Sequence, residues 1–221
     1  MNIHLENIPC ATAELLRILS KEKHMSRFSL VGGTALALQL GHRQSEDLDF
    51  VFDAEKIDTI GIKRFIARTF PDYRLIREER AYQLDFLVKN VKLTFFSTGA
   101  VIIPFKIKPH TIQLGTVNIA RADVIAVLKM ATISQRCTIR DYYDIYYISR
   151  YVIPLDEIFR LTKSMIPNLS PITYTETIIY TKDIPENAIG SHLFPKEQIS
   201  KEKIAHYFIG EIKKMAPKSK E

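Results

Sequence analysis

The chain has 221 residues, of which 46% are hydrophobic, and its formal net charge at pH 7 is +6. This length fits one large domain or two small ones, and the apolar content is sufficient for a sizeable buried core. No apolar run approaches the roughly 18 residues that a membrane-spanning helix needs, so we expect no membrane association.

The N-terminal residues and the cysteines favour a cytoplasmic protein. The first ten residues, MNIHLENIPC, contain no basic stretch followed by an apolar one, so we expect no secretion signal. Two cysteines are too few for a disulfide scaffold, and reduced thiols in the cytoplasm are the simpler interpretation. The positive charge favours a polyanionic partner such as a nucleotide or RNA, although a surface with surplus lysines gives the same balance.

The first 120 residues predict a mixed domain of helices and strands. Leu15, Leu16 and Leu19 recur at helical spacing and predict a helix over 11–25, with Thr12 as its N-cap. Lys89-Asn90 separates two β-rich runs, which is typical of a hairpin over 81–98. The remaining elements predicted here are strands at 28–33, 47–52 and 111–120 and helices at 34–41 and 60–70.

After residue 120 the pattern becomes helical. Apolar periodicity predicts helices over 122–136, 139–151, 154–166 and 199–216, the last with Ser200 as its cap. Residues 167–195 are rich in proline and turn formers and predict no definite element. The sequence therefore predicts an α+β protein with a mixed domain at 1–120 and a helical bundle at 121–221.

A glycine pair follows the first predicted strand. Gly32 and Gly33 stand where that strand gives way to a helix, and free backbone N–H groups at a helix N-terminus bind phosphate. Glycine lets a phosphate approach closely, and Thr34 adds a hydroxyl. The pair has the spacing of neither common phosphate-binding motif, so an ordinary tight turn remains the alternative.

Two acids in the second predicted strand form the stronger signal. Asp47 and Asp49 are two residues apart, a spacing that points both side chains to one face of a strand. Adjacent carboxylates repel each other unless a cation lies between them, and Mg²⁺ commonly takes one or two carboxylates together with substrate phosphates. The pattern indicates an NTP site, with a solvent-facing strand carrying scattered charge as the alternative.

The stretch GGTALAL…LGHRQSEDLDF, followed by KMA and RDYYDIYYI, resembles the AbiEii/AbiGii-type toxin nucleotidyltransferases of the polymerase-β-like superfamily. The resemblance covers about residues 28–150. It implies a nucleotidyltransferase-like mixed β-sheet flanked by helices, followed by a helical bundle. It also implies transfer of a nucleotidyl group from an NTP, with Mg²⁺ or Mn²⁺, to a hydroxyl acceptor such as RNA or tRNA, and an antitoxin protein as partner.

The resemblance also assigns roles to residues. It implies that Gly33 and Thr34 contact the triphosphate, that Asp47 and Asp49 hold the metal ions, and that Lys129 and Asp141 match later motifs of the family. The same block contains further candidate nucleotide-binding residues, which are Gly32, Arg43, Ser45 and Arg140, with Asp144 one helical turn beyond Asp141. The residues alone leave an alternative for each of these. Lys129 extends to solvent in the first alternative. In the second, RDYYD is an ordinary first turn of a helix, in which Asp141 suits the helix dipole and Arg140 forms an i,i+4 ion pair with Asp144.

One feature departs from the superfamily pattern. Transferases of this kind usually carry a third carboxylate on a neighbouring strand, and Thr94 stands at the expected position. Either Asp85 or Asp141 substitutes for it, or activity is weak or absent.

The sequence thus favours a Mg²⁺-dependent nucleotidyltransferase of a toxin–antitoxin or abortive-infection system. Three alternatives stay open. The first is a non-catalytic nucleotide- or RNA-binding module with a degenerate site. The second is a nucleotidyltransferase acting on an aminoglycoside-like small molecule. The third is a purely structural partner protein, which the acid pair disfavours.

Overall fold

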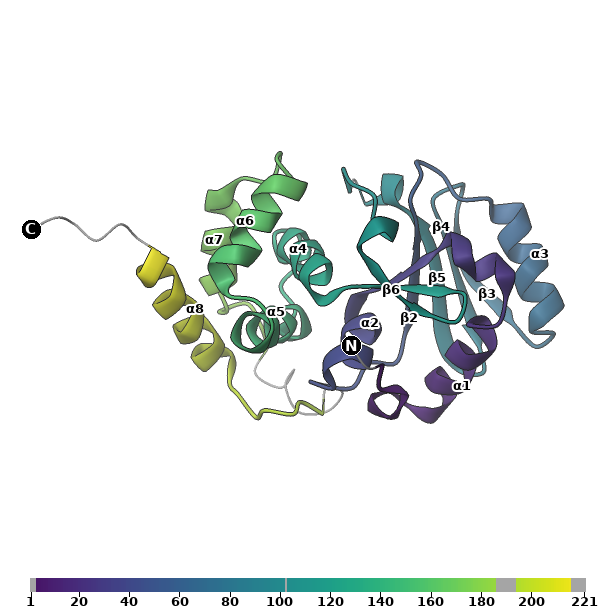
Figure 1. Ribbon diagram of the computed structural model, residues 1–221, viewed down its shortest axis with the longest axis horizontal. Helices are drawn as coiled ribbons and strands as arrows, with labels where there is room; N and C mark the ends of the chain where they lie inside the picture. The colour runs from purple at the N-terminus through teal and green to yellow at the C-terminus, as the bar shows by residue number, and fades with distance from the viewer. Residues whose placement is uncertain (1–2, 102, 186–193, 216–221) are drawn as a thin grey trace, which may run out of the picture. The chain divides into compact units, whose positions relative to one another are not determined.

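The computed structural model describes residues 3–101, 103–185 and 194–215 (Figure 1). The chain divides into two compact units, Met1–Arg121 and Ala122–Glu221. No helix in these described ranges is long and apolar enough to cross a membrane.

The first unit is a mixed sheet with helices. Its strands are β1 Ser29–Val31, β2 Leu48–Phe52, β3 Arg74–Glu79, β4 Gln83–Val88, β5 Val91–Ser97, β6 Thr111–Leu114 and β7 Val117–Ala120. Its helices are α1 Cys10–Leu19, α2 Gly32–Leu40 and α3 Thr59–Thr69, with short 3-10 turns η1 Leu5–Asn7, η2 Lys23–Arg27, η3 Thr98–Ala100 and η4 Lys108–His110.

Within the described residues the seven strands form one sheet in the order β3-β4-β5-β2-β1-β7-β6. β1 pairs in parallel with β7, and β2 pairs in parallel with β5, whereas the other neighbours are antiparallel. The order places β2 at the centre, between β1 and β5, so residues of β2 face neighbours on both sides.

Local chemistry explains the turns that frame this sheet. Lys89 and Asn90 have positive φ angles of 51° and 64°, the conformation that a two-residue hairpin loop requires, so the predicted hairpin is confirmed as β4 and β5. Gly41 has a φ of 56° and ends α2 as a left-handed cap.

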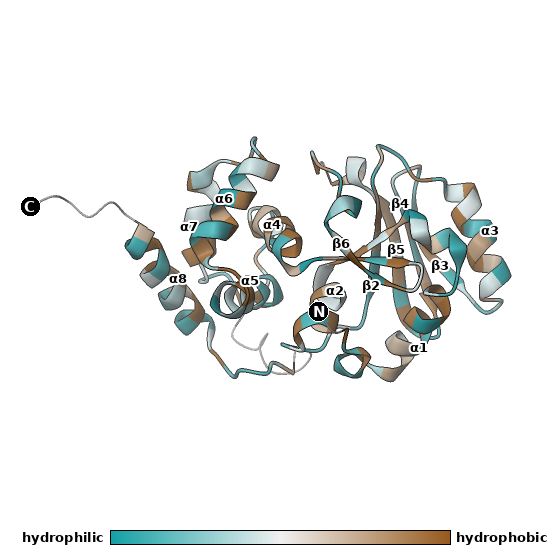
Figure 2. Ribbon diagram, viewed as in Figure 1, coloured by the Kyte–Doolittle hydropathy of each residue, from teal (hydrophilic) through white to brown (hydrophobic). Residues whose placement is uncertain are grey.

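The core of the first unit is aromatic on one face of the sheet. Phe50, Phe95 and Phe86 lie on adjacent strands, with ring centroids 5.6 Å and 6.3 Å apart along the series. Leu15 and Leu19 of α1 are fully buried, and α1 packs against β5. Figure 2 shows β4 and β5 to be rich in hydrophobic residues, whereas α3 carries both hydrophobic and hydrophilic residues.

Three predictions for the first unit differ from the structure. The helix expected over 11–25 ends at Leu19 and is followed by η2. Thr12 is not its N-cap, because Pro9 holds that position and the Thr12 hydroxyl donates to the Glu46 carbonyl oxygen at 2.8 Å. Strand β3 was not predicted, because its six residues are all exposed and show no alternation of apolar and polar side chains.

The second unit is helical, which confirms the predicted α+β class. It contains α4 Ala122–Ile133, α5 Ile139–Tyr151, α6 Leu155–Met165, α7 Pro171–Ile179 and α8 Lys201–Met215. The Ser200 hydroxyl accepts a hydrogen bond from the Lys203 N–H at 3.3 Å, as expected of a cap on α8. Helix α7 lies in the stretch for which the sequence predicts no element, and residues 186–193 of that stretch lie outside the described ranges.

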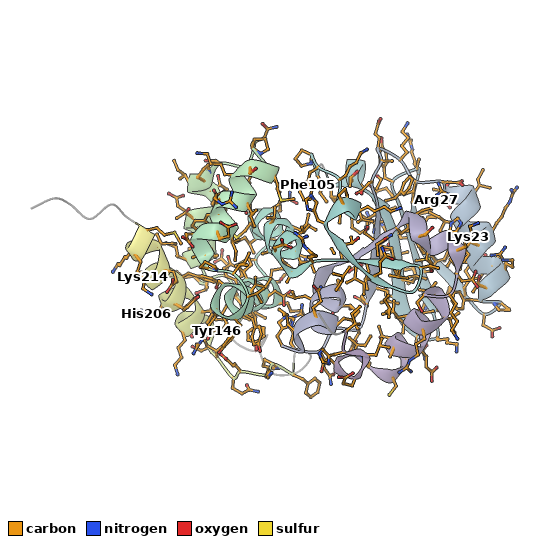
Figure 3. All side chains as sticks on the ribbon, in the orientation of Figure 1. Lys23, Arg27, Phe105, Tyr146, His206 and Lys214 are labelled. Carbon is orange, nitrogen blue, oxygen red and sulfur yellow. The ribbon has the colours of Figure 1, made fainter. Side chains whose placement is uncertain are left out.

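Tyrosines of α5 attach the segment before α8. The Tyr146 hydroxyl (Figure 3) donates to Glu197 at 2.9 Å, and the Tyr143 hydroxyl accepts from the Glu197 N–H at 3.1 Å. Tyr207 of α8 packs edge-on against Tyr146 with ring centroids 5.0 Å apart. These rings therefore serve the packing of the second unit.

Candidate functional site

The β1–α2 turn is built for close approach. Gly32 has a φ of 73°, which L side chains rarely adopt, and α2 begins at this residue. A Cβ on Gly33 would collide with Nη2 of Arg43 and lie 2.8 Å from Oγ of Ser45. The turn therefore holds Arg43 and Ser45 directly against the N-terminus of α2.

Thr34 ties the following loop to the same helix. Its hydroxyl donates to the Asp47 carbonyl oxygen and hydrogen-bonds with Ser45 Oγ at 2.9 Å. Thr34 is only 1% exposed, so its hydroxyl stabilises the loop through these hydrogen bonds and does not face solvent. Arg43, also buried, donates from Nη1 to the Gln44 carbonyl oxygen at 2.8 Å, which fixes the bend ahead of the acids.

The acid pair adjoins this turn. Asp49 of β2 is the register partner of Val31, the last residue of β1, and a Cβ on Gly32 would lie 3.2 Å from Asp49 Oδ2. Asp49 is half-buried, whereas Asp47 is exposed and precedes β2 by one residue. The structure thus brings one carboxylate to the helix N-terminus, where the helix dipole favours negative charge.

A polar row continues from Asp49 across the sheet. Asp49 pairs in register with Thr94 of β5, and Thr94 pairs with Asp85 of β4. Register partners in a sheet point to the same face and are about 5 Å apart, so Asp85 lies on the face of Asp49, two strands away.

The two members of this row beyond Asp49 are both buried but differ in their partners. Asp85 accepts a hydrogen bond from Gln83 Nε2 at 2.8 Å, and its Oδ2 lies 3.5 Å from the Lys92 ammonium. The Thr94 hydroxyl, by contrast, has no hydrogen-bond partner among the described residues, although Thr94 is only 5% exposed.

The donor set suits a hard cation. In the described ranges no three or more His, Cys, Asp or Glu side chains are grouped so as to hold a metal ion. Asp47 and Asp49 alone still provide the one or two carboxylates that Mg²⁺ takes when substrate phosphates complete its shell. The glycine turn lies directly beside Asp49, since a Cβ on Gly32 would be 3.2 Å from Asp49 Oδ2.

The later candidates form a cluster in the second unit. Lys129 of α4 is 7% exposed, and its Nζ lies 2.5 Å from Asp141 Oδ1 and 2.9 Å from Asp144 Oδ2 on α5. The alternative in which Lys129 extends to solvent is therefore wrong. Arg140, in the first turn of α5, is exposed.

Asp141 is the most connected member of this cluster. Its Oδ2 accepts from Thr138 Oγ1 at 2.6 Å and from Arg136 Nε at 3.0 Å. Burial alone would raise the pKa of Asp141, but Lys129, Thr138 and Arg136 together hold that pKa below its ordinary value. Arg136 and Thr138 were not among the predicted site residues, although Thr138 and Asp141 have the spacing of a capping pair.

Comparison with known proteins identifies the family. The model of the family described as "Nucleotidyl transferase AbiEii toxin, Type IV TA system" matches residues 14–176. An uncharacterized protein of Aquifex aeolicus (strain VF5) is 30% identical over 189 residues, which cover 81% of this chain and 87% of that protein.

A solved structure has a similar fold. MenT4, a nucleotidyltransferase toxin from Mycobacterium tuberculosis H37Rv, gives a TM-score of 0.52 at 12% identity, covering 93% of this chain and 86% of MenT4. The match of the family model extends over both the glycine–aspartate turn and the Lys129–Asp141 cluster. The chain belongs to the AbiEii nucleotidyltransferase toxin family of type IV toxin–antitoxin systems.

Proposed function

We propose that this protein transfers a nucleotidyl group from an NTP to a hydroxyl acceptor in a reaction that depends on Mg²⁺. The observation that carries the proposal is the position of Asp49 Oδ2 beside Gly32 at the N-terminus of α2. Backbone N–H groups there suit phosphate oxygens, and a carboxylate beside them suits the cation that those oxygens share.

In this proposal Asp47 and Asp49 hold the divalent cation, which supplies charge neutralisation to the triphosphate when bound. The Gly32–Gly33 turn binds the phosphates through its N–H groups, and Arg43 adds positive charge at the same turn. Ser45 and Thr34 keep the loop in place through their mutual hydrogen bond.

The reaction forms one bond and breaks another. The acceptor oxygen bonds to the α-phosphorus while the bond from that phosphorus to the bridging oxygen breaks, and pyrophosphate leaves with the electron pair. We propose Asp85 as the group that takes the acceptor's proton, because it is the carboxylate in the row of Asp49 and Thr94. Lys129, Arg140 and Asp141 remain predictions drawn from the family resemblance.

The acceptor and partners are finer proposals. The net charge of +6 supports an RNA acceptor, since a basic protein attracts a polyanion. Membership of a toxin–antitoxin family supports an antitoxin protein as partner. The two cysteines, Cys10 and Cys137, are both free, which supports a reducing cytoplasm.

Labelled NTPs, Mg²⁺ and total RNA test the proposal. We expect label to move to RNA only when Mg²⁺ is present, and Asp49→Asn to reduce transfer at least 100-fold. Asp72→Asn is the matched control, because Asp72 is an exposed acid of the same unit. The absence of label transfer with wild-type protein, or equal transfer by Asp49→Asn, contradicts the proposal.

A non-catalytic nucleotide-binding module is the second candidate. Thr94 in place of a carboxylate, and the contact of Asp85 with Lys92, favour it. NTP binding of equal affinity with and without Mg²⁺, together with no transfer to RNA or to a small hydroxyl compound, supports this module over the enzyme.

A further inference from the structure

The Thr94 hydroxyl is a buried polar group of the first unit, and it lies in the row that includes Asp49. It is buried without a hydrogen-bond partner among the described residues, and such a group loses free energy relative to one bonded to water or protein. A β-branched apolar residue such as valine fills the same volume at a strand position and carries no such cost. The hydroxyl therefore requires a hydrogen-bond partner that the described residues do not provide.

The position of Thr94 limits what that partner is. Its register neighbours on the two sides are Asp49 and Asp85, so the hydroxyl lies in a row of carboxylates. The Gln83 amide and the Lys92 ammonium already serve Asp85. On the other side, Asp49 is half-buried and its Oδ2 lies beside Gly32 at the N-terminus of α2. A partner for the Thr94 hydroxyl is therefore expected on the side of Asp49.

A hydrated cation on Asp49 fits this requirement. Mg²⁺ and Mn²⁺ keep several water ligands when proteins bind them through one or two carboxylates.

We propose that Thr94 is a positioning residue that holds the divalent cation of Asp49 through a metal-bound water. The inference rests on the proposed function, which places the cation at Asp47 and Asp49. It goes beyond that function by giving a role to Thr94, which has no carboxylate with which to bind the cation directly. It also predicts one cation at this site, because the next residue in the row is neutral and the following one contacts Lys92.

Titration of the purified full-length chain with Mn²⁺, followed by electron paramagnetic resonance, tests this without any turnover. Loss of a hydrogen-bonding partner beyond the direct ligands typically lowers metal affinity 10- to 100-fold. We expect one Mn²⁺ per wild-type chain, a 10- to 100-fold weaker affinity for Thr94→Val, and near wild-type affinity for Thr94→Ser. Thr94→Asp adds a carboxylate beside Asp49, and we expect tighter binding or a second Mn²⁺.

A second measurement separates this role from a structural one. Without metal, Thr94→Val removes an unsatisfied buried hydroxyl, so we expect its denaturation midpoint to equal or exceed that of wild type. A lower midpoint for Thr94→Val would mean that the hydroxyl stabilises the sheet itself, which overturns the proposal.

The failures of the two proposals are distinguishable. If wild type binds Mn²⁺, Asp49→Asn loses it and Thr94→Val keeps full affinity, then the role of Thr94 is wrong and the cation at Asp49 stands. If wild type binds no Mn²⁺ with or without ATP, both the cation centre and the role of Thr94 are wrong.

Discussion

Replacing Lys129 with methionine tests the buried charge cluster of the second unit. The Lys129 and Asp144 side chains are 9% and 0% exposed, and their charged atoms are 2.9 Å apart. Removing one partner of a buried ion pair typically costs about 3–5 kcal/mol, because the other charge is left buried and uncompensated. For a protein of this size, that corresponds to a fall in melting temperature of about 6–20 °C.

Urea denaturation followed by circular dichroism measures the change, and Lys63→Met is the matched control. Lys63 contacts Glu78 at 2.6 Å, but both side chains are more than a third exposed, so we expect a loss of only about 0–1 kcal/mol. The triple variant Lys129→Met with Asp141→Asn and Asp144→Leu should recover most of the lost stability, because it removes the ammonium and both of the carboxylate charges that it contacts. A loss below about 1 kcal/mol for Lys129→Met, or no recovery in the triple variant, refutes the reasoning.

Three further outcomes are expected. Gly33→Ala should lower stability by about 1–3 kcal/mol and reduce NTP affinity, because the new Cβ forces Arg43 to move. Gly210→Ala should change neither, because nothing lies within 4 Å of its new Cβ. Calorimetry measures the stability and the NTP affinity of each variant. The pKa of Asp141 is lowered in the folded state, so its contribution to stability is complete above its unfolded pKa and is lost as pH falls; the penalty of Asp141→Asn should therefore shrink between pH 6 and about pH 3 in urea titrations. Lys89→Gly should stabilise the hairpin by about 1 kcal/mol, because its φ of 51° disfavours side chains, and an unchanged midpoint contradicts this.

Local patterns predicted the elements around the glycine turn. The paired glycines located the β1–α2 junction, and the tyrosine-rich pattern over 139–151 gave the bounds of α5 correctly. Strand β3 was missed because both of its faces are exposed, so its sequence, RLIREE, has no apolar period. Helix α7 was missed because Pro171 and its threonines are typical of loops, although proline also suits the first helical turn.

Contacts between distant segments explain why the rest of the candidate site did not follow from the sequence. The row of Asp49, Thr94 and Asp85 requires the strand order β4-β5-β2, in which β2 pairs with β5 although α3, β3 and β4 lie between them in the chain. Only this strand order shows that the carboxylate of Asp85 lies one strand away from the position expected for the third acid. The predicted hairpin at Lys89-Asn90 implies the register of Asp85 with Thr94, but nothing in the sequence fixed the pairing of β5 with β2 that aligns Thr94 with Asp49.

The burial of Lys129 changes how its variants must be interpreted. An ammonium with carboxylate oxygens at 2.5 Å and 2.9 Å already has its charge balanced, and phosphate would have to compete with both for it. Loss of activity on replacing Lys129 is therefore expected from unfolding as well as from lost chemistry. Lys129→Arg keeps the charge but not the compact ammonium, so a variant of that kind with wild-type stability and no transfer would separate a chemical role from a structural one.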